Sequence, residues 1–174
     1  ARRSAATGKS NSRSRKTSSI GAVHLWALTA YFNPVGYHSR RDNYRLFRQR
    51  LGLPLVTVEL GFGGGFELGP GDADVLIQIE GGDTLWQKER LLNIALASLP
   101  PACRFVAWLD CDILFADRDW SEQAVRVLER EPIAQPFDRL VHLRRGELPE
   151  NALPPEAHSL RTSFASRWRE RSLP

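Results

Sequence analysis

Cysteine is scarce in this sequence, and long apolar runs are missing. Only Cys103 and Cys111 are present, and they form no Cys-x-x-Cys pair from which a disulfide framework could be derived. This content excludes a small disulfide-stapled scaffold and mildly favours a reducing, cytoplasmic compartment. No apolar run approaches the length of a membrane span, and the first residues lack the apolar core of a secretory signal.

Acidic residues are missing from the first 20 positions, which carry six basic side chains. The other 154 residues carry 18 basic and 20 acidic side chains, so the net charge of +4 belongs to the N-terminal end. We predict a disordered basic tail over residues 1–19, either a solvated terminus or a contact for nucleic acid or an acidic membrane. The near-neutral remainder argues against stable nucleic-acid binding by a globular domain.

Strand and helix patterns alternate along residues 23–109. Apolar runs predict strands over 23–30, 55–60, 74–79 and 104–109. Helical spacing predicts one helix from an N-cap at Ser39 to Gly52, and another that Thr84 caps and Pro100 ends. This alternation is typical of an α/β fold, with a mostly parallel sheet flanked by helices.

Three further segments complete the predicted organisation. The glycine-dense stretch 61–71 opens no helix, so we interpret it as a mobile loop or turn rather than a phosphate cradle. A helix is predicted over 119–130 and an irregular last strand over 133–143. We therefore expect a core over 20–146 and a poorly defined extension over 147–174, with no confident element except a short helix near Phe164–Arg169.

Two aspartates, Asp110 and Asp112, directly follow the strand predicted at 104–109. In an extended chain their side chains point to the same side. Burying two adjacent carboxylates there costs several kcal/mol unless a cation is present (about 3–5 kcal/mol for an uncompensated charge). A hard divalent ion, Mg²⁺ or Mn²⁺, answers that requirement and can also hold a diphosphate.

The segment Trp108–Phe115 around this Asp-x-Asp pair resembles the DxD segment of GT-A glycosyltransferases. Residues 86–93 look like the helix that precedes that segment, residues 29–34 like the end of the first strand, and Gln135–Asp138 like the strand that follows. The resemblance covers roughly residues 22–145, and only the DxD context is specific. It implies a GT-A-like core that transfers a sugar from a nucleoside-diphosphate sugar, with a UDP-sugar as the first guess, to an acceptor hydroxyl of a glycan, lipid or small molecule.

The resemblance also implies roles for individual residues. Asp112 would bind the Mn²⁺ or Mg²⁺ ion directly, and Asp110 would bind the donor ribose or sugar, or reach the metal through water. The expected base-pocket residues are Tyr31, Phe32 and Asn33. Lys88 and Arg90 are candidates for binding the donor's phosphates or for orienting the Asp-x-Asp pair, and Arg41, Asn43 and Arg45 are weaker candidates of the same kind. Trp26 and Trp108 are expected in the core.

The C-terminal part departs from the family pattern. His142 and His158 lie in segments that do not align, so no general base is assigned and a truncated or decayed chain remains open. One alternative is a haloacid-dehalogenase-type phosphatase, which also has Asp-x-Asp after a strand. It is disfavoured by Leu114 and by the lack of any lysine after Lys88. Another alternative is a non-enzymatic binding protein on a decayed transferase fold.

Overall fold

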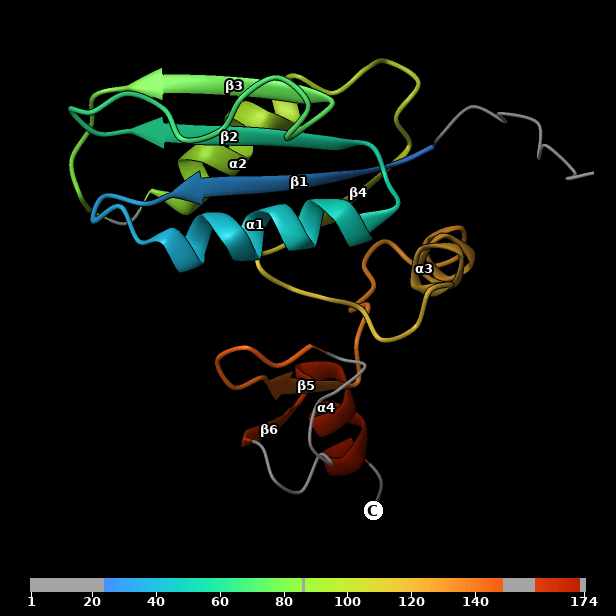
Figure 1. The fold of residues 1–174 in the computed structure, drawn as a ribbon. Helices are drawn as coiled ribbons and strands as arrows, with labels where there is room; N and C mark the ends of the chain where they lie inside the picture. The colour runs from blue at the N-terminus through green and yellow to red at the C-terminus, as the bar shows by residue number, and fades with distance from the viewer. Residues whose placement is uncertain (1–23, 86, 149–158, 173–174) are drawn as a thin grey trace, which may run out of the picture.

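The computed structural model describes residues 24–85, 87–148 and 159–172 (Figure 1). The predicted tail and Trp86 lie outside the described residues. The described elements follow one another as β1 (Leu25–Phe32), α1 (His38–Leu51), β2 (Leu55–Gly61), β3 (Val75–Glu80), α2 (Lys88–Ala97), β4 (Phe105–Trp108), α3 (Trp120–Leu128), β5 (Arg139–His142), β6 (Ser159–Thr162) and α4 (Phe164–Ser172).

The first four strands form one parallel sheet in the order β3-β2-β1-β4. Ala27 pairs with Leu55 of β2 on one side and with Ala107 of β4 on the other. The predicted α/β fold with a parallel sheet is therefore confirmed at this level. The chain moves from β1 outward to β2 and β3, and then returns past β1 to β4, which reverses the direction of winding between β1 and β4.

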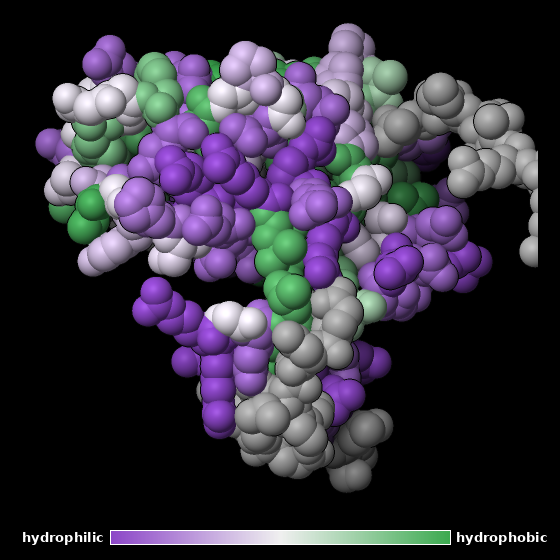
Figure 2. Space-filling model, in the orientation of Figure 1, coloured by the Kyte–Doolittle hydropathy of each residue, from purple (hydrophilic) through white to green (hydrophobic). Residues whose placement is uncertain are grey.

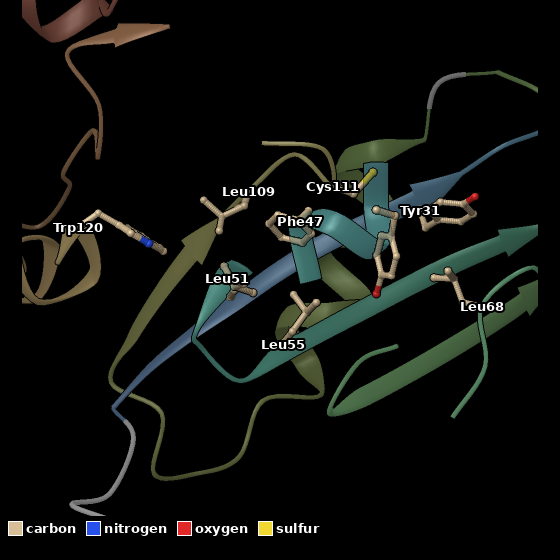
Figure 3. Close-up of a cluster of buried hydrophobic side chains, with 10 residues drawn as sticks. Tyr31, Phe47, Leu51, Leu55, Leu68, Leu109, Cys111 and Trp120 are labelled. Atoms are coloured by element: carbon tan, nitrogen blue, oxygen red, sulfur yellow. The ribbon is translucent and has the colours of Figure 1, made fainter. Parts of the chain in front are cut away.

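Helices α1 and α2 cover opposite faces of this sheet (Figure 1). Tyr44, Phe47 and Leu51 of α1 are buried, as their helical spacing predicts, and they pack on one face together with other apolar side chains (Figure 3). On the other face, α2 buries Leu91, Leu92 and Ala95 against β1 and β2. The outward side of α1 is mainly hydrophilic (Figure 2), as expected for a surface helix.

The predicted helix starts were wrong by a few residues. Helix α1 begins at His38, with Tyr37 at the N-cap, so Ser39 lies inside the first turn instead of capping it. Helix α2 begins at Lys88, and Thr84 precedes it without capping it. The predicted end of α1 is right, because Gly52 adopts the left-handed conformation (φ 69°) that suits a C-terminal cap.

The strand predicted over 133–143 is shorter than predicted. Only Arg139–His142 forms a strand, and β5 pairs antiparallel with β6 in a separate two-stranded sheet. Gln135 and Asp138 contact the start of α4 instead: the Gln135 Oε1 accepts a 2.9 Å hydrogen bond from the Ala165 N–H, and Asp138 accepts one from the Ser166 hydroxyl. The pairing of β5 with β6 crosses the predicted boundary at 146 and orders residues for which the sequence pattern predicted only a short helix.

Among the described residues, no helix is long and apolar enough to cross a membrane.

Candidate functional site

A cavity of about 420 Å³ lies at the carboxyl ends of β1 and β4, where the winding of the sheet reverses. Crevices at such a reversal are the usual ligand sites of open parallel sheets. The starts of α1 and α2 close the cavity from the two faces of the sheet. Its lining residues are Ala30, Phe32, Arg40, Gln87, Lys88, Leu91, Asp110, Cys111 and Asp112.

The Asp-x-Asp segment alternates between the core and the cavity. Leu109 and Cys111 are buried in the cluster beneath α1, whereas Asp110 and Asp112 are exposed and line the cavity. Two hydrogen bonds tie this segment to β1: the Leu109 N–H donates to the Leu28 carbonyl (3.0 Å), and the Thr29 hydroxyl donates to the Leu109 carbonyl (2.8 Å). The fold therefore fixes both carboxylates at the mouth of the crevice.

The physical reason given above for a cation at this pair needs correction. Strand β4 ends at Trp108, so Asp110 and Asp112 follow the strand and are not part of it. Both side chains are exposed, so no burial penalty requires a cation. Trp108 is also 60% exposed instead of lying in the core, whereas Trp26 packs against the α2-side cluster as expected.

Lys88, the first residue of α2, forms an ion pair with Asp110 across the cavity. The sequence analysis expected Lys88 to bind the donor's phosphates or to orient the Asp-x-Asp pair, and in the structure Lys88 contacts Asp110 of that pair. The pair joins α2 to the loop after β4. Because both side chains are partly exposed, its net contribution to stability is small, about 0–1 kcal/mol.

Arg40 is a cavity residue that the sequence analysis did not select. It lies in the first turn of α1, and its Nε is buried and has no hydrogen-bond partner among the described residues. A buried unpaired donor costs about 1–3 kcal/mol, and the Nε of Arg41, which does not line the cavity, is unpaired in the same way among the described residues. The sequence spacing could have predicted the position of Arg40, because Arg40 precedes Tyr44, Phe47 and Leu51 by 4, 7 and 11 residues and so lies on the same inward face of the helix.

The predicted base-pocket residues separate onto two faces of β1. Phe32 points to the α2 side and lines the cavity, but Tyr31 points to the α1 side. Tyr31 and Asn33 both donate hydrogen bonds to Glu67 in the glycine-dense loop, and they line a second hollow of about 260 Å³. Burial and the Glu67 carboxylate raise the pKa of the Tyr31 phenol well above its ordinary value.

The remaining candidate residues lie away from the cavity lining. Arg90 is exposed and donates to the Gln87 side-chain oxygen (2.7 Å), so it reaches the cavity only through Gln87. Asn43 and Arg45 are exposed on α1, and an Arg41 Nη contacts the His38 ring 3.4 Å away. His142 lies on β5, outside the parallel sheet, and His158 lies outside the described residues.

The carboxylates at the cavity suit a metal ion that takes its other ligands from water and substrate phosphates. In the part of the chain that the structure describes, no group of three or more His, Cys, Asp or Glu side chains could hold a metal ion. Protein ligands alone therefore form no cage there. Two carboxylates do match the usual binding of Mg²⁺, which takes one or two carboxylates and completes its shell with water and substrate phosphates.

No protein-family model, curated protein or solved structure matches this chain.

Proposed function

We propose that this protein is a metal-dependent glycosyltransferase that moves a sugar from a nucleoside-diphosphate sugar, with a UDP-sugar as the first candidate, to an acceptor hydroxyl. The observation that carries this proposal is one cavity, at the reversal of a parallel sheet, that holds two carboxylates and two cationic side chains. The resemblance of the Asp-x-Asp context to GT-A enzymes gives the reaction type.

The charges in the cavity suit a metal–diphosphate complex better than either component alone. Arg40 and Lys88 balance Asp110 and Asp112, so these four side chains together are close to neutral. A divalent ion would add two positive charges, and a diphosphate ester would offset about that much negative charge. Arginine and lysine are common phosphate ligands, and carboxylates are common ligands of hard divalent ions.

The loop between β1 and α1 argues against the other common ligand of such a crevice, a dinucleotide. Dinucleotide-binding folds carry a glycine-rich turn there, which allows the pyrophosphate to approach the helix N-terminus. Here residues 33–37 read Asn-Pro-Val-Gly-Tyr, with one glycine. The charged groups come instead from Arg40 of α1, from Lys88 of α2 and from the loop after β4.

The proposal gives the cavity residues separate roles. Asp112 would hold the metal ion, and Asp110 would bind the donor ribose or sugar, or contact the metal through water. Lys88 and Arg40 would bind the phosphates, while Phe32 would pack against the donor from the sheet. The ion, when bound, supplies charge neutralisation for the departing diphosphate. No described residue is assigned as general base.

Calorimetric titration of UDP into the full chain tests this proposal, with Mn²⁺ and then with EDTA. We expect metal-dependent binding that Asp112→Asn weakens by at least about tenfold, since it removes a charged ligand (about 1.5–3 kcal/mol). Asp42→Asn is the matched control, because Asp42 is exposed on α1 and does not line the cavity. The control variant should bind UDP as the unaltered chain does.

Two results would refute the proposal. The first is no binding of UDP or of GDP in the presence of Mn²⁺. The second is binding that Asp112→Asn leaves unchanged. If the protein bound neither UDP nor GDP but hydrolysed p-nitrophenyl phosphate, the phosphatase alternative would be favoured.

A further inference from the structure

Helix α4 exposes its aromatic side chains and buries its small polar ones. Phe164 and Trp168, which we call the aromatic ridge, are 65% and 64% exposed. Their rings stack with centroids 6.0 Å apart, because positions i and i+4 share one face of a helix. The other face is buried through Ser166 and the preceding Ser163, which are 8% and 3% exposed. The usual amphipathic arrangement, with aromatic residues toward the protein, is therefore reversed here.

Polar contacts hold α4 in this orientation. The Ser163 hydroxyl oxygen caps the helix by accepting from the Ser166 N–H (3.1 Å), and the Gln135 side chain accepts from the Ala165 N–H. Asp138 accepts from the Ser166 hydroxyl on the same buried side. Since hydrogen bonds anchor the helix start on its serine side, the aromatic ridge lies on the exposed side of α4.

Arginine residues flank the aromatic ridge in the sequence. Residues 159–174 contain four arginines and one glutamate. Arg167 and Arg169 flank Trp168 in sequence, and the rotation of about 100° per residue sends them to its two sides. Arg161 is exposed on β6, immediately before the helix. An exposed aromatic pair between arginines is typical of a helix that lies in the headgroup region of a membrane.

We propose that the aromatic ridge and its flanking arginines bind the surface of membranes that contain anionic lipids. The aromatic rings enter the boundary between headgroups and acyl chains, while the guanidinium groups stay at the level of the lipid phosphates. Nucleic acid is the weaker candidate, because the two rings already stack on each other and so offer less face to a base. This surface is separate from the cavity, so its binding does not depend on the proposed transferase function.

Vesicle sedimentation of the full chain tests this surface. Phosphatidylcholine vesicles with about a third of phosphatidylserine are compared with pure phosphatidylcholine. We expect binding to the anionic vesicles, weakened at least about tenfold by Phe164→Ser with Trp168→Ser. Arg167→Gln with Arg169→Gln should lower the preference for phosphatidylserine. Leu85→Ser with Ile133→Ser is the matched control, since these two apolar residues are also exposed (71% and 83%) and lie elsewhere in the chain.

A second measurement keeps the test valid if the aromatic variant folds poorly. Brominated lipids should quench tryptophan fluorescence of the unaltered chain, and Trp168→Phe should remove most of that quenching. The basic N-terminal segment is the same in every variant, so its charge cannot produce the differences. The proposal is overturned if the chain does not bind anionic vesicles, or if the aromatic variant binds them as tightly as the control. Binding to a single-stranded oligonucleotide alone, lost in the aromatic variant, would assign the surface to nucleic acid instead.

Discussion

Glu59 anchors the glycine-dense loop, and its removal gives the sharpest prediction about stability. The side chain is 2% exposed at the centre of β2. Its carboxylate accepts hydrogen bonds from the Glu67 N–H (2.6 Å), the Leu68 N–H (3.2 Å) and the Gln78 amide (2.8 Å). A buried carboxylate with three donors holds the returning half of the loop against β2 and β3.

The cost of Glu59→Leu follows from what those donors lose. Gln78 is exposed and can turn to water, so its loss is small. The Leu68 N–H is a buried backbone donor and the Glu67 N–H is a partly buried one, and a buried donor costs about 1–3 kcal/mol when it is left unpaired. Relief of the buried charge offsets part of that loss. We therefore expect Glu59→Leu to lower the free energy of unfolding by about 2–5 kcal/mol, and Glu59→Gln, which keeps one acceptor oxygen, to lower it by less.

Urea denaturation followed by circular dichroism measures this difference. Glu80→Leu serves as the control, because Glu80 is an exposed carboxylate at the end of the adjacent strand β3. The control should change stability by no more than about 0.5 kcal/mol. If Glu59→Leu were as stable as the unaltered chain, the hydrogen bonds of Glu59 would not be what holds the loop.

Two further predictions concern the cavity. Lys88→Met frees Asp110 from its ion pair. We therefore expect Mn²⁺ alone to bind several-fold more tightly, and UDP in the presence of Mn²⁺ to bind several-fold more weakly, because a phosphate ligand is lost. If calorimetry showed both affinities changing in the same direction, Lys88 would not compete with the metal ion for Asp110. Burial raises the pKa of the Cys111 thiol to about 11, so in a Cys103→Ser background its alkylation by iodoacetamide should be very slow at pH 8 and rise about tenfold per pH unit toward 11. The same shift makes a stability contribution that is present below about pH 9 and is lost as the pH rises toward 11. Rapid labelling of the folded protein at pH 8 would show that Cys111 is not buried as described.

Sequence patterns predicted the parallel sheet well because its strands and helices have simple periodicities. The apolar runs at 55–60 and 74–79 form β2, which is fully buried, and β3, which is partly exposed, and the spacing of Tyr44, Phe47 and Leu51 predicted the inward face of α1. The small sheet of β5 and β6 was predicted only in part: β5 lies within the strand predicted over 133–143, and β6 was not predicted. Its strands have four residues each, and much of their surface is exposed, so they carry little alternation.

The sequence predicted the two carboxylates of the candidate site, but it did not show which side chain pairs with which carboxylate. The reason is geometric. A motif such as Asp110-x-Asp112 is local, so the chain itself displays it. The contact of Lys88 with Asp110 joins residues 22 apart, and it exists only because α2 returns the chain to the far side of β1. Arg40 required one more step, the knowledge that α1 begins at the same end of the sheet at which β4 ends. In a parallel sheet every strand ends at that edge, so each helix that follows a strand starts there. The first inward-facing residue of each helix is therefore a site candidate, and this rule selects Arg40 from the sequence alone once the strands are assigned.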